Sequence, residues 1–231
     1  MRFTKEDARR IVLNCAKQYQ NKLVNKKFII IYRERQDNSV RFIEVIFHDR
    51  NYQHLTGLEL LNQDGAVIHR QSVNFYRKCI DNKLSIDEIG FKNDGTTQLK
   101  LTALPVLMDI TKITKITGDY NNLRPYLLVD KVIGGVNFCL GLSREGNWYV
   151  PSSALLEDIK RLTDRPSQVL AILQKDSKEE IYHVVKYVAK GLNLNNIRFP
   201  DEIRQKINLE NYEYKGTPNL IPQNRKNKKT S

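Results

Sequence analysis

The stretch "KKFIIIYRERQDNSVRFIEVIFH", residues 26–48, decides the fold class of this chain. It consists of two runs rich in β-branched and aromatic residues, and "QDNS" between them has a typical turn composition. This pattern predicts an antiparallel hairpin. In the second run Ile43, Val45 and Phe47 alternate onto one face, which we expect to face the core. In the first run both faces are apolar, which predicts a central strand of the sheet.

The segment before the hairpin has the spacing of a helix. Thr4 and Asp7 resemble a capping box, a common start of a helix. Apolar residues then recur every three or four positions, which predicts a buried stripe: Ala8, Val12, Cys15, Tyr19 and Leu23. Charged and amide residues interrupt the segment throughout, unlike a signal sequence, so we expect a cytoplasmic protein.

After the hairpin the pattern predicts helices, then short strands, then a strand and a helix. We expect helices over residues 71–84, 85–91 and 101–120, with Pro105 in a first turn and Gly118 as a C-cap. Strands are expected over residues 125–134, 136–142, 147–151 and 168–175, and a last helix over 177–192.

This order is not an alternation of strands and helices. It therefore predicts an α+β fold, with an N-terminal helix packed on a largely antiparallel sheet, a helical insert and a C-terminal helix. We expect a single domain over residues 3–195, followed by a polar, basic and partly disordered extension over residues 196–231.

The charge of the chain limits its partners. The formal net charge is +12 in 231 residues, and a basic protein of this kind commonly contacts RNA or another nucleic acid. A lysine-rich surface caused by a compositional bias of the genome is the alternative interpretation. No apolar run approaches the roughly 20 residues that a membrane-spanning helix needs.

Several kinds of site are disfavoured by the motifs. The three cysteines, Cys15, Cys79 and Cys139, are far apart and form no CxxC pair, so we expect buried thiols and no disulfide or zinc site. The glycines fit neither the GxGxxG nor the GxxxxGK[ST] spacing of phosphate-binding loops. The carboxylates match no metal-binding motif. We therefore expect no metal and no cofactor.

The best candidate for a reaction centre follows the hairpin, in "HDRNYQHLTG", residues 48–57. A neutral imidazole at His54 can take a proton from a hydroxyl and return it to a leaving group. Thr56 supplies a hydroxyl, and Gly57 lets its N–H approach a phosphate. This combination suits metal-independent attack of an RNA 2′-hydroxyl on its own phosphate. The alternative is a turn with a capping threonine.

Residues around this segment are candidates for binding nucleic acid. Arginine side chains neutralise phosphates, and tyrosine rings stack on bases. The candidates are Arg33, Arg41, Arg50 and Tyr52, with Tyr32 as another ring, and the C-terminal lysines Lys226, Lys228 and Lys229.

A second candidate segment is "NWYVPSS", residues 147–153. One interpretation is structural: Pro151 and the serines open a helix over residues 154–162. The functional interpretation places the Ser152 hydroxyl in the same cleft as His54.

Four stretches together resemble the phage barnase–EndoU–colicin–RelE-like nucleases (PBECR type): residues 26–58, "DGTTQLKLTALPVLM", "GDYNNLRPYLLVDKVIGGVNFCLGL" and "WYVPSS". The resemblance covers residues 11–191, and its sharpest motif is "HLTG". It implies an α+β fold and a metal-independent RNase of phage or mobile-element origin that acts as a toxin or in conflict between phage and host. It also implies catalytic roles for His54, Thr56, Tyr149 and Ser152. The chain lacks a clear pair of a glutamate and a histidine as acid and base, although Glu44 shares a strand face with His48.

Two other functions remain open. The His-x-Thr box also occurs loosely in ADP-ribosyltransferases, which would use NAD. A non-catalytic phage protein that binds nucleic acid or inhibits a host nuclease would also explain the basic surface. An antitoxin or a host protein is a further expected partner.

Overall fold

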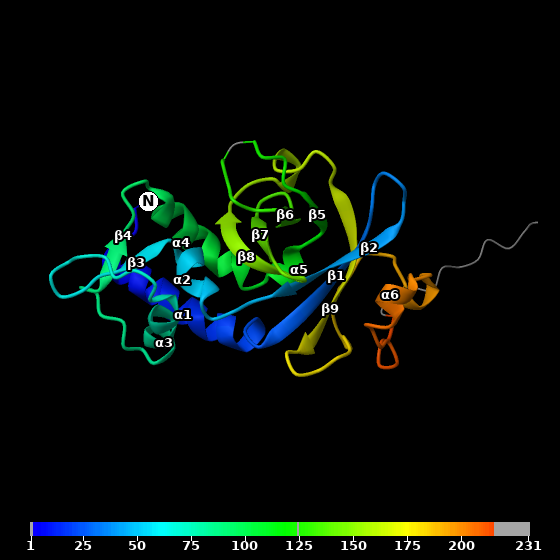
Figure 1. Cartoon of the computed structure of the whole chain (residues 1–231), viewed down its shortest axis with the longest axis horizontal. Coiled ribbons are helices and arrows are strands. Elements are labelled where there is room, and N and C mark those ends of the chain that lie inside the picture. The colour runs from blue at the N-terminus through cyan, green and yellow to red at the C-terminus, as the bar shows by residue number, and fades with distance from the viewer. Residues whose placement is uncertain (1, 124, 215–231) are drawn as a thin grey trace, which may run out of the picture.

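The computed structural model describes residues 2–123 and 125–214, and these form an α+β fold (Figure 1). Most helices gather at one end of the molecule and cover one side of a large sheet. The helices are α1 (Lys5–Lys22), α2 (Asn51–Thr56), α3 (Ser72–Ile80), α4 (Thr96–Leu107), α5 (Ile110–Ile113) and α6 (Asp201–Arg204), with 3₁₀ turns η1 (Ile159–Arg161) and η2 (Leu194–Asn196).

The large sheet has the strand order β1-β2-β8-β7-β6-β5-β9-β10, and β1 also pairs with β9. The strands from β1 round to β9 therefore close into a ring. Neighbouring strands are antiparallel except β2 and β8, which pair in parallel through Val45 and Tyr149. The strands are β1 (Lys26–Arg33), β2 (Val40–Ile46), β5 (Ile116–Asp119), β6 (Lys131–Gly134), β7 (Cys139–Glu145), β8 (Trp148–Leu155), β9 (Ser167–Asp176) and β10 (Val184–Val188). A separate two-stranded sheet joins β3 (Leu58–Leu60) and β4 (Ile89–Phe91).

The predicted hairpin, its core face and the predicted first helix are confirmed. β1 and β2 pair in antiparallel register, with Ile30 opposite Ile43 and Phe28 opposite Val45. Ile43, Val45 and Phe47 are all buried in the main core. The capping box at the start of α1 is present, and the predicted apolar stripe of this helix is buried. β1 lies between β2 and β9, so its two apolar faces belong to a central strand.

The long helix expected over residues 101–120 is wrong. The chain forms α4, then α5, and then β5. Pro105 lies near the end of α4 and not in its first turn. Gly118 is a strand residue opposite Val132, and a Cβ atom there would lie 2.3 Å from the Thr163 hydroxyl. The close approach of Thr163, and not a helix end, requires the glycine.

Three other expected helices are also wrong. Residues 85–91 form a turn that leads into β4. The Glu88 carboxylate accepts a hydrogen bond from the Ser85 N–H (3.0 Å), as in a capping box, but no helix follows. The helix expected over 154–162 is the end of β8 and the short η1 turn. The helix expected over 177–192 contains strand β10, which pairs with β9. Pairing with a neighbouring strand overrides the local helical spacing in the last two cases.

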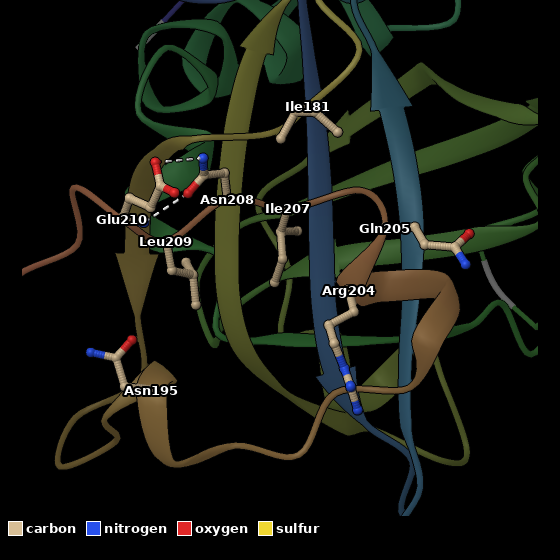
Figure 2. A pocket seen from close by; sticks show the side chains of 8 residues that line it. All are labelled: Ile181, Asn195, Arg204, Gln205, Ile207, Asn208, Leu209 and Glu210. Atoms are coloured by element: carbon tan, nitrogen blue, oxygen red, sulfur yellow. Dashed lines mark hydrogen bonds between the residues drawn. The ribbon is translucent and has the colours of Figure 1, made fainter.

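The packed chain extends beyond residue 195, where we expected the domain to end. Phe199 and Ile203 are buried in a second core on the outer side of β1 and β9. Tyr182 and Lys206 both donate hydrogen bonds of 2.9 Å to the Glu44 carboxylate, which fastens this segment to β2. Figure 2 shows a pocket on the same segment, where Asn208 and Glu210 are hydrogen bonded. Glu44 therefore has a structural role here.

Candidate nucleic-acid site

A tight turn places His54 at the end of the sheet. After β2, the Asn51 side chain accepts the His48 N–H at 3.1 Å, and α2 begins at Asn51. The helix ends at Gly57, whose φ of 69° belongs to the left-handed region. A Cβ atom at Gly57 would also lie 3.1 Å from the Thr97 backbone, so both the conformation and the space require glycine.

Three hydrogen bonds bring Lys92 and Lys100 to the end of α2. The Thr97 hydroxyl donates to the Gly57 carbonyl at 2.6 Å and accepts the Lys92 N–H at 3.0 Å. One turn further along α4, the Lys100 ammonium donates to the His54 carbonyl at 2.9 Å. The loop after β4 and the first half of α4 are thereby fixed against α2.

A cavity of about 340 Å³ lies beside this turn and is rich in basic groups. Its lining includes five basic side chains and one carboxylate, Glu59: Arg50, His54, His69, Arg70 and Lys92. An excess of positive charge around a concave surface attracts and binds anions, above all phosphates. This cavity, with His54 in its lining, is therefore the candidate anion-binding site.

The basic neighbours change the protonation of this site. Burial by surrounding atoms, and then Lys100 and Lys92, lower the pKa of His54 to about 4, and a hydrogen bond with the Ser152 backbone partly opposes the shift. Burial and Lys92 lower the pKa of Lys100 to about 8. At pH 7 His54 is therefore a neutral imidazole, while Lys100 is mostly charged. A bound anion would raise both pKa values, because it favours the charged forms.

The Ser152 backbone lies close to His54, but Ser152 does not line the cavity, so the expected place of its hydroxyl in the same cleft stays a prediction. Gly141 pairs with Ser153 and Leu142 with Pro151, so Ser152 is the extra residue of a β-bulge in β8. Bulges of this kind re-aim side chains and are common near active sites. Its neighbour Tyr149 packs partly buried against the main core and is not part of the cavity lining.

Two residues of the predicted site have structural roles. Thr56 is fully buried, and its hydroxyl donates to the Gln53 carbonyl (2.7 Å) and accepts the Leu58 N–H (3.0 Å). The expectation that Thr56 contacts a phosphate is therefore wrong for this structure. Tyr52 is also fully buried, and its hydroxyl donates to the Val12 carbonyl at 2.6 Å, so it cannot stack on a base.

The local bonds of Thr56 predict the effect of replacing it. Thr56→Val should lower the free energy of unfolding by about 1–3 kcal/mol, because the buried Leu58 N–H loses its acceptor. Thr102→Val on α4, where the hydroxyl bonds only within an exposed helix face, is the control and should cost less. Urea denaturation of the two variants measures both. A neutral effect of Thr56→Val would contradict the structural role.

The predicted arginines do not share one site. Arg50 lines the cavity with His54 and forms an ion pair with Glu145 at the end of β7. Arg33 and Arg41 lie at the opposite end of the hairpin, roughly 17 Å along β2 from Ile46. There Arg41 pairs with Asp37 at 2.8 Å. Tyr32, the alternative stacking ring, is buried.

Lys226, Lys228 and Lys229 lie outside the described residues.

Sequence reasoning missed Lys92, Lys100, His69 and Arg70. His69, Arg70 and Lys92 line the cavity from a loop before α3 and a loop after β4, and Lys100 on α4 bonds to the His54 carbonyl, so only the tertiary fold brings them to His54. The stretch "DGTTQLK" contains Lys100, but nothing in its spacing indicates contact with residue 54.

Over residues 2–123 and 125–214, no three His, Cys, Asp or Glu side chains come together as a potential metal site. Within the same part of the chain, no helix has the length and apolar character required to cross a membrane. All three cysteines are free and buried, and burial raises the pKa of each thiol, to about 11 for Cys15 and about 12 for Cys79 and Cys139.

The structure combines a mostly antiparallel sheet, closed into a ring, with a basic cavity that contains His54 beside the turn that follows β2. The chain belongs to the phage-Barnase-EndoU-ColicinE5/D-RelE like nuclease4 family (PBECR4), whose model matches residues 11–191. No curated protein and no solved structure matches the chain. The family confirms the resemblance seen in the sequence and supports a nuclease-like function with a nucleic-acid substrate.

Proposed function

We propose that this protein is a metal-independent endoribonuclease whose active site is the basic cavity around His54. The proposal rests on the position of His54 in one cavity with Arg50, Arg70 and Lys92, and burial, Lys100 and Lys92 lower its pKa to about 4, which favours the neutral imidazole. The membership of a nuclease family supports it. Phosphate binding alone would not need a neutral base among the cations.

The chemistry follows from these groups. The arginines and lysines bind the phosphodiester, and His54 takes the proton of the adjacent 2′-hydroxyl as its oxygen attacks phosphorus. The bond from phosphorus to the 5′-oxygen breaks, and the protonated His54 returns the proton to that oxygen. Lys100 stabilises the extra negative charge on the phosphoryl oxygens. The products carry a 2′,3′-cyclic phosphate and a 5′-hydroxyl.

The low pKa of His54 in the free protein is compatible with this role. A base works best when its pKa is near the pH of the reaction. Since the shift includes repulsion from Lys100 and Lys92, a bound phosphate offsets that part and brings the His54 pKa upward. The substrate thus adjusts the base that acts on it. The hydrogen bond with the Ser152 backbone would orient the imidazole.

The two pKa values predict the pH dependence of cleavage. Activity needs neutral His54, which is present above about pH 4, and charged Lys100, which is present below about pH 8. We expect kcat/KM to rise through about pH 4 and to fall through about pH 8. Cleavage of a fluorescent RNA oligonucleotide in buffers with EDTA measures this profile.

Lys100→Arg is the matched variant that tests whether deprotonation of Lys100 causes the fall of kcat/KM at alkaline pH. Arginine keeps its charge far above pH 8, so this variant should stay active and lose the decline near pH 8. Lys100→Met should lose most of its activity at every pH. If the alkaline decline persists in Lys100→Arg, another group causes it and the assigned role of Lys100 is wrong.

The proposal extends to a biological role. We infer that the protein acts on cytoplasmic RNA as a toxin or a conflict factor of phage or mobile-element origin, with an antitoxin or a host protein as a further partner. Inducible expression in bacteria tests this: wild type should stop growth as total RNA is degraded, while Lys100→Met should do neither. Arrest of growth with intact RNA would favour the binding-protein alternative, and label transferred from NAD would favour an ADP-ribosyltransferase.

A further inference from the structure

A large groove lies along the last strand of the sheet. Its volume is about 1010 Å³, and its lining combines residues 183–192, which include β10, with residues 211–214. This volume reaches the upper limit of pockets that bind small molecules, which is about 1,000 Å³. The groove shares no described lining residue with the cavity around His54. It is therefore a separate candidate site, with room for a ligand larger than a small molecule.

β10 has one free edge. It pairs with β9 on one side, and none of the described strands follows it on the other. Just before β10, the Tyr182 N–H donates to the Lys206 carbonyl at 2.8 Å, and the Tyr182 carbonyl accepts the Asn208 N–H at 2.9 Å. The next residue, His183, donates its N–H to Gln174 of β9. Because neighbouring residues of a strand bond to opposite edges, the chain after Asn208 starts out beside the free edge.

The groove follows this free edge. Every residue from 183 to 192 lines it, whereas a cavity on one face of a strand would meet only every second side chain. Its other wall is the segment 211–214, which no backbone hydrogen bond joins to β10 within the described residues. The Ala189 N–H donates to Leu170 of β9 (2.8 Å), so the Val188 N–H and carbonyl point to the open edge. Such an edge is a template for another extended chain.

Apolar side chains of the groove are accessible to a ligand. Val184 is 38% exposed, and Val185, Tyr187 and Tyr212 are only partly buried. Two of these residues, Val184 and Val185, are neighbours on β10, so they lie on opposite faces of the strand. A strand that paired with β10 would place its own side chains alternately beside these two faces. The groove therefore suits a polypeptide that contains apolar residues.

The charges of the groove select the partner further. Lys186 and Lys190 are exposed, and Glu213 is the one carboxylate among the described lining residues. These lysines attract carboxylates and repel another basic chain. A second copy of this protein, with a formal net charge of +12, would meet this repulsion. A nucleic acid cannot continue the backbone ladder of a strand edge, so the edge favours an acidic polypeptide.

We propose that the groove along β10 binds an acidic polypeptide segment in an extended conformation, which adds a strand to the large sheet. Backbone hydrogen bonds to the free edge hold the segment, apolar side chains pack beside Val184 and Val185, and carboxylates pair with Lys186 and Lys190. The proposal does not depend on the RNase function, since no described residue of the His54 cavity takes part.

Binding of a model peptide tests this surface. The probe is a blocked peptide of alternating glutamate and valine, slightly longer than the five residues of β10. It is titrated into the full chain and followed by NMR. We expect shifts in the backbone amides of β10 and of Tyr212, with a Kd below about 1 mM. N-methylation of the amides on one edge of the peptide should weaken binding about tenfold or more, because each lost backbone hydrogen bond costs roughly fivefold.

Matched charge reversals locate the site. Lys186→Glu with Lys190→Glu should weaken binding of the acidic peptide about tenfold and favour a peptide with lysine in place of glutamate. Lys5→Glu with Lys17→Glu makes the same change in net charge on α1, outside the groove, and should leave the affinity within about twofold. All four lysines are exposed, so both proteins should keep the Tm of wild type.

Several results would overturn the proposal. Equal loss of affinity in the two charge-reversed proteins would show that net charge, and not this groove, causes binding. Unchanged affinity for the N-methylated peptide would exclude strand addition, and absence of binding at about 1 mM would exclude the site. A dimer in sedimentation that Lys186→Glu with Lys190→Glu dissociates would assign the groove to a second copy. Tighter peptide binding in Leu220→Ser with Ile221→Ser would assign it to the chain's own C-terminal residues.

Discussion

Replacing His54 with alanine should lower the rate of RNA cleavage by about 10²–10⁴-fold, the usual contribution of one positioned general acid or base. The same change should leave the Tm within a few degrees of wild type. The residue keeps an exposed surface at the edge of a cavity although other atoms surround its ring, and the substitution removes only the hydrogen bond with the Ser152 backbone. The hydrogen bond from Lys100 is made to the His54 backbone carbonyl and survives. Loss of such a side chain costs about 0.5 kcal/mol or less.

His183→Ala is the control for this experiment. His183 is also exposed and lies near Glu179, 3.7 Å away, just before β10 and outside the His54 cavity. It should therefore affect neither cleavage nor stability. Full activity in His54→Ala would contradict the assigned role. A fall in stability of about 1–3 kcal/mol, with activity lost in proportion, would indicate that His54 is structural.

Replacing Tyr52 with alanine should have the largest effect on stability, with a loss of about 3–5 kcal/mol in the free energy of unfolding. Tyr52 is fully buried and packs against the rings of Tyr19, Phe75 and Tyr76. Its loss leaves a cavity in the centre of the main core. Chemical denaturation, with the slope of the transition compared between variants, measures the loss.

Tyr52→Phe separates the ring from the hydroxyl. It should cost about 1–3 kcal/mol, because the Val12 carbonyl loses its donor while the packing stays. RNA affinity of the folded Tyr52→Phe protein should equal that of wild type. Weaker RNA binding with unchanged stability would restore the earlier interpretation of Tyr52 as a stacking ring.

The parts of the fold that local sequence predicts are those with a strong and short-range pattern. The β1–β2 hairpin and α1 follow from alternation, from apolar spacing and from the Thr4–Asp7 capping box. β10 was predicted as a helix because "EEIYHVVKYVAKG" has helical spacing. Its β-branched residues pair with β9 instead, and this long-range partner is invisible in the local pattern.

The predictions for the site also succeed or fail according to whether a local pattern or a long-range contact decides them. A histidine after a strand end predicts a catalytic role for His54, which stays a prediction, and the structure brings the Ser152 backbone close to it. Thr56 belongs to the same motif, yet its hydroxyl closes the helix turn, which was the alternative interpretation of "HLTG". Lys100 lies 46 positions from His54, and no spacing rule connects residues so far apart in the sequence.

The chemical ends of the RNA products test the central claim most directly. Purified protein is incubated with an RNA oligonucleotide in EDTA, and the fragments are analysed by mass spectrometry. If the 2′-hydroxyl attacks its own phosphate with His54 as the base, the fragments should carry 2′,3′-cyclic phosphate and 5′-hydroxyl ends, and a 2′-deoxy residue at the cleaved position should block the cut. Fragments with 3′-hydroxyl and 5′-phosphate ends, formed only when a divalent metal is supplied, would contradict the account.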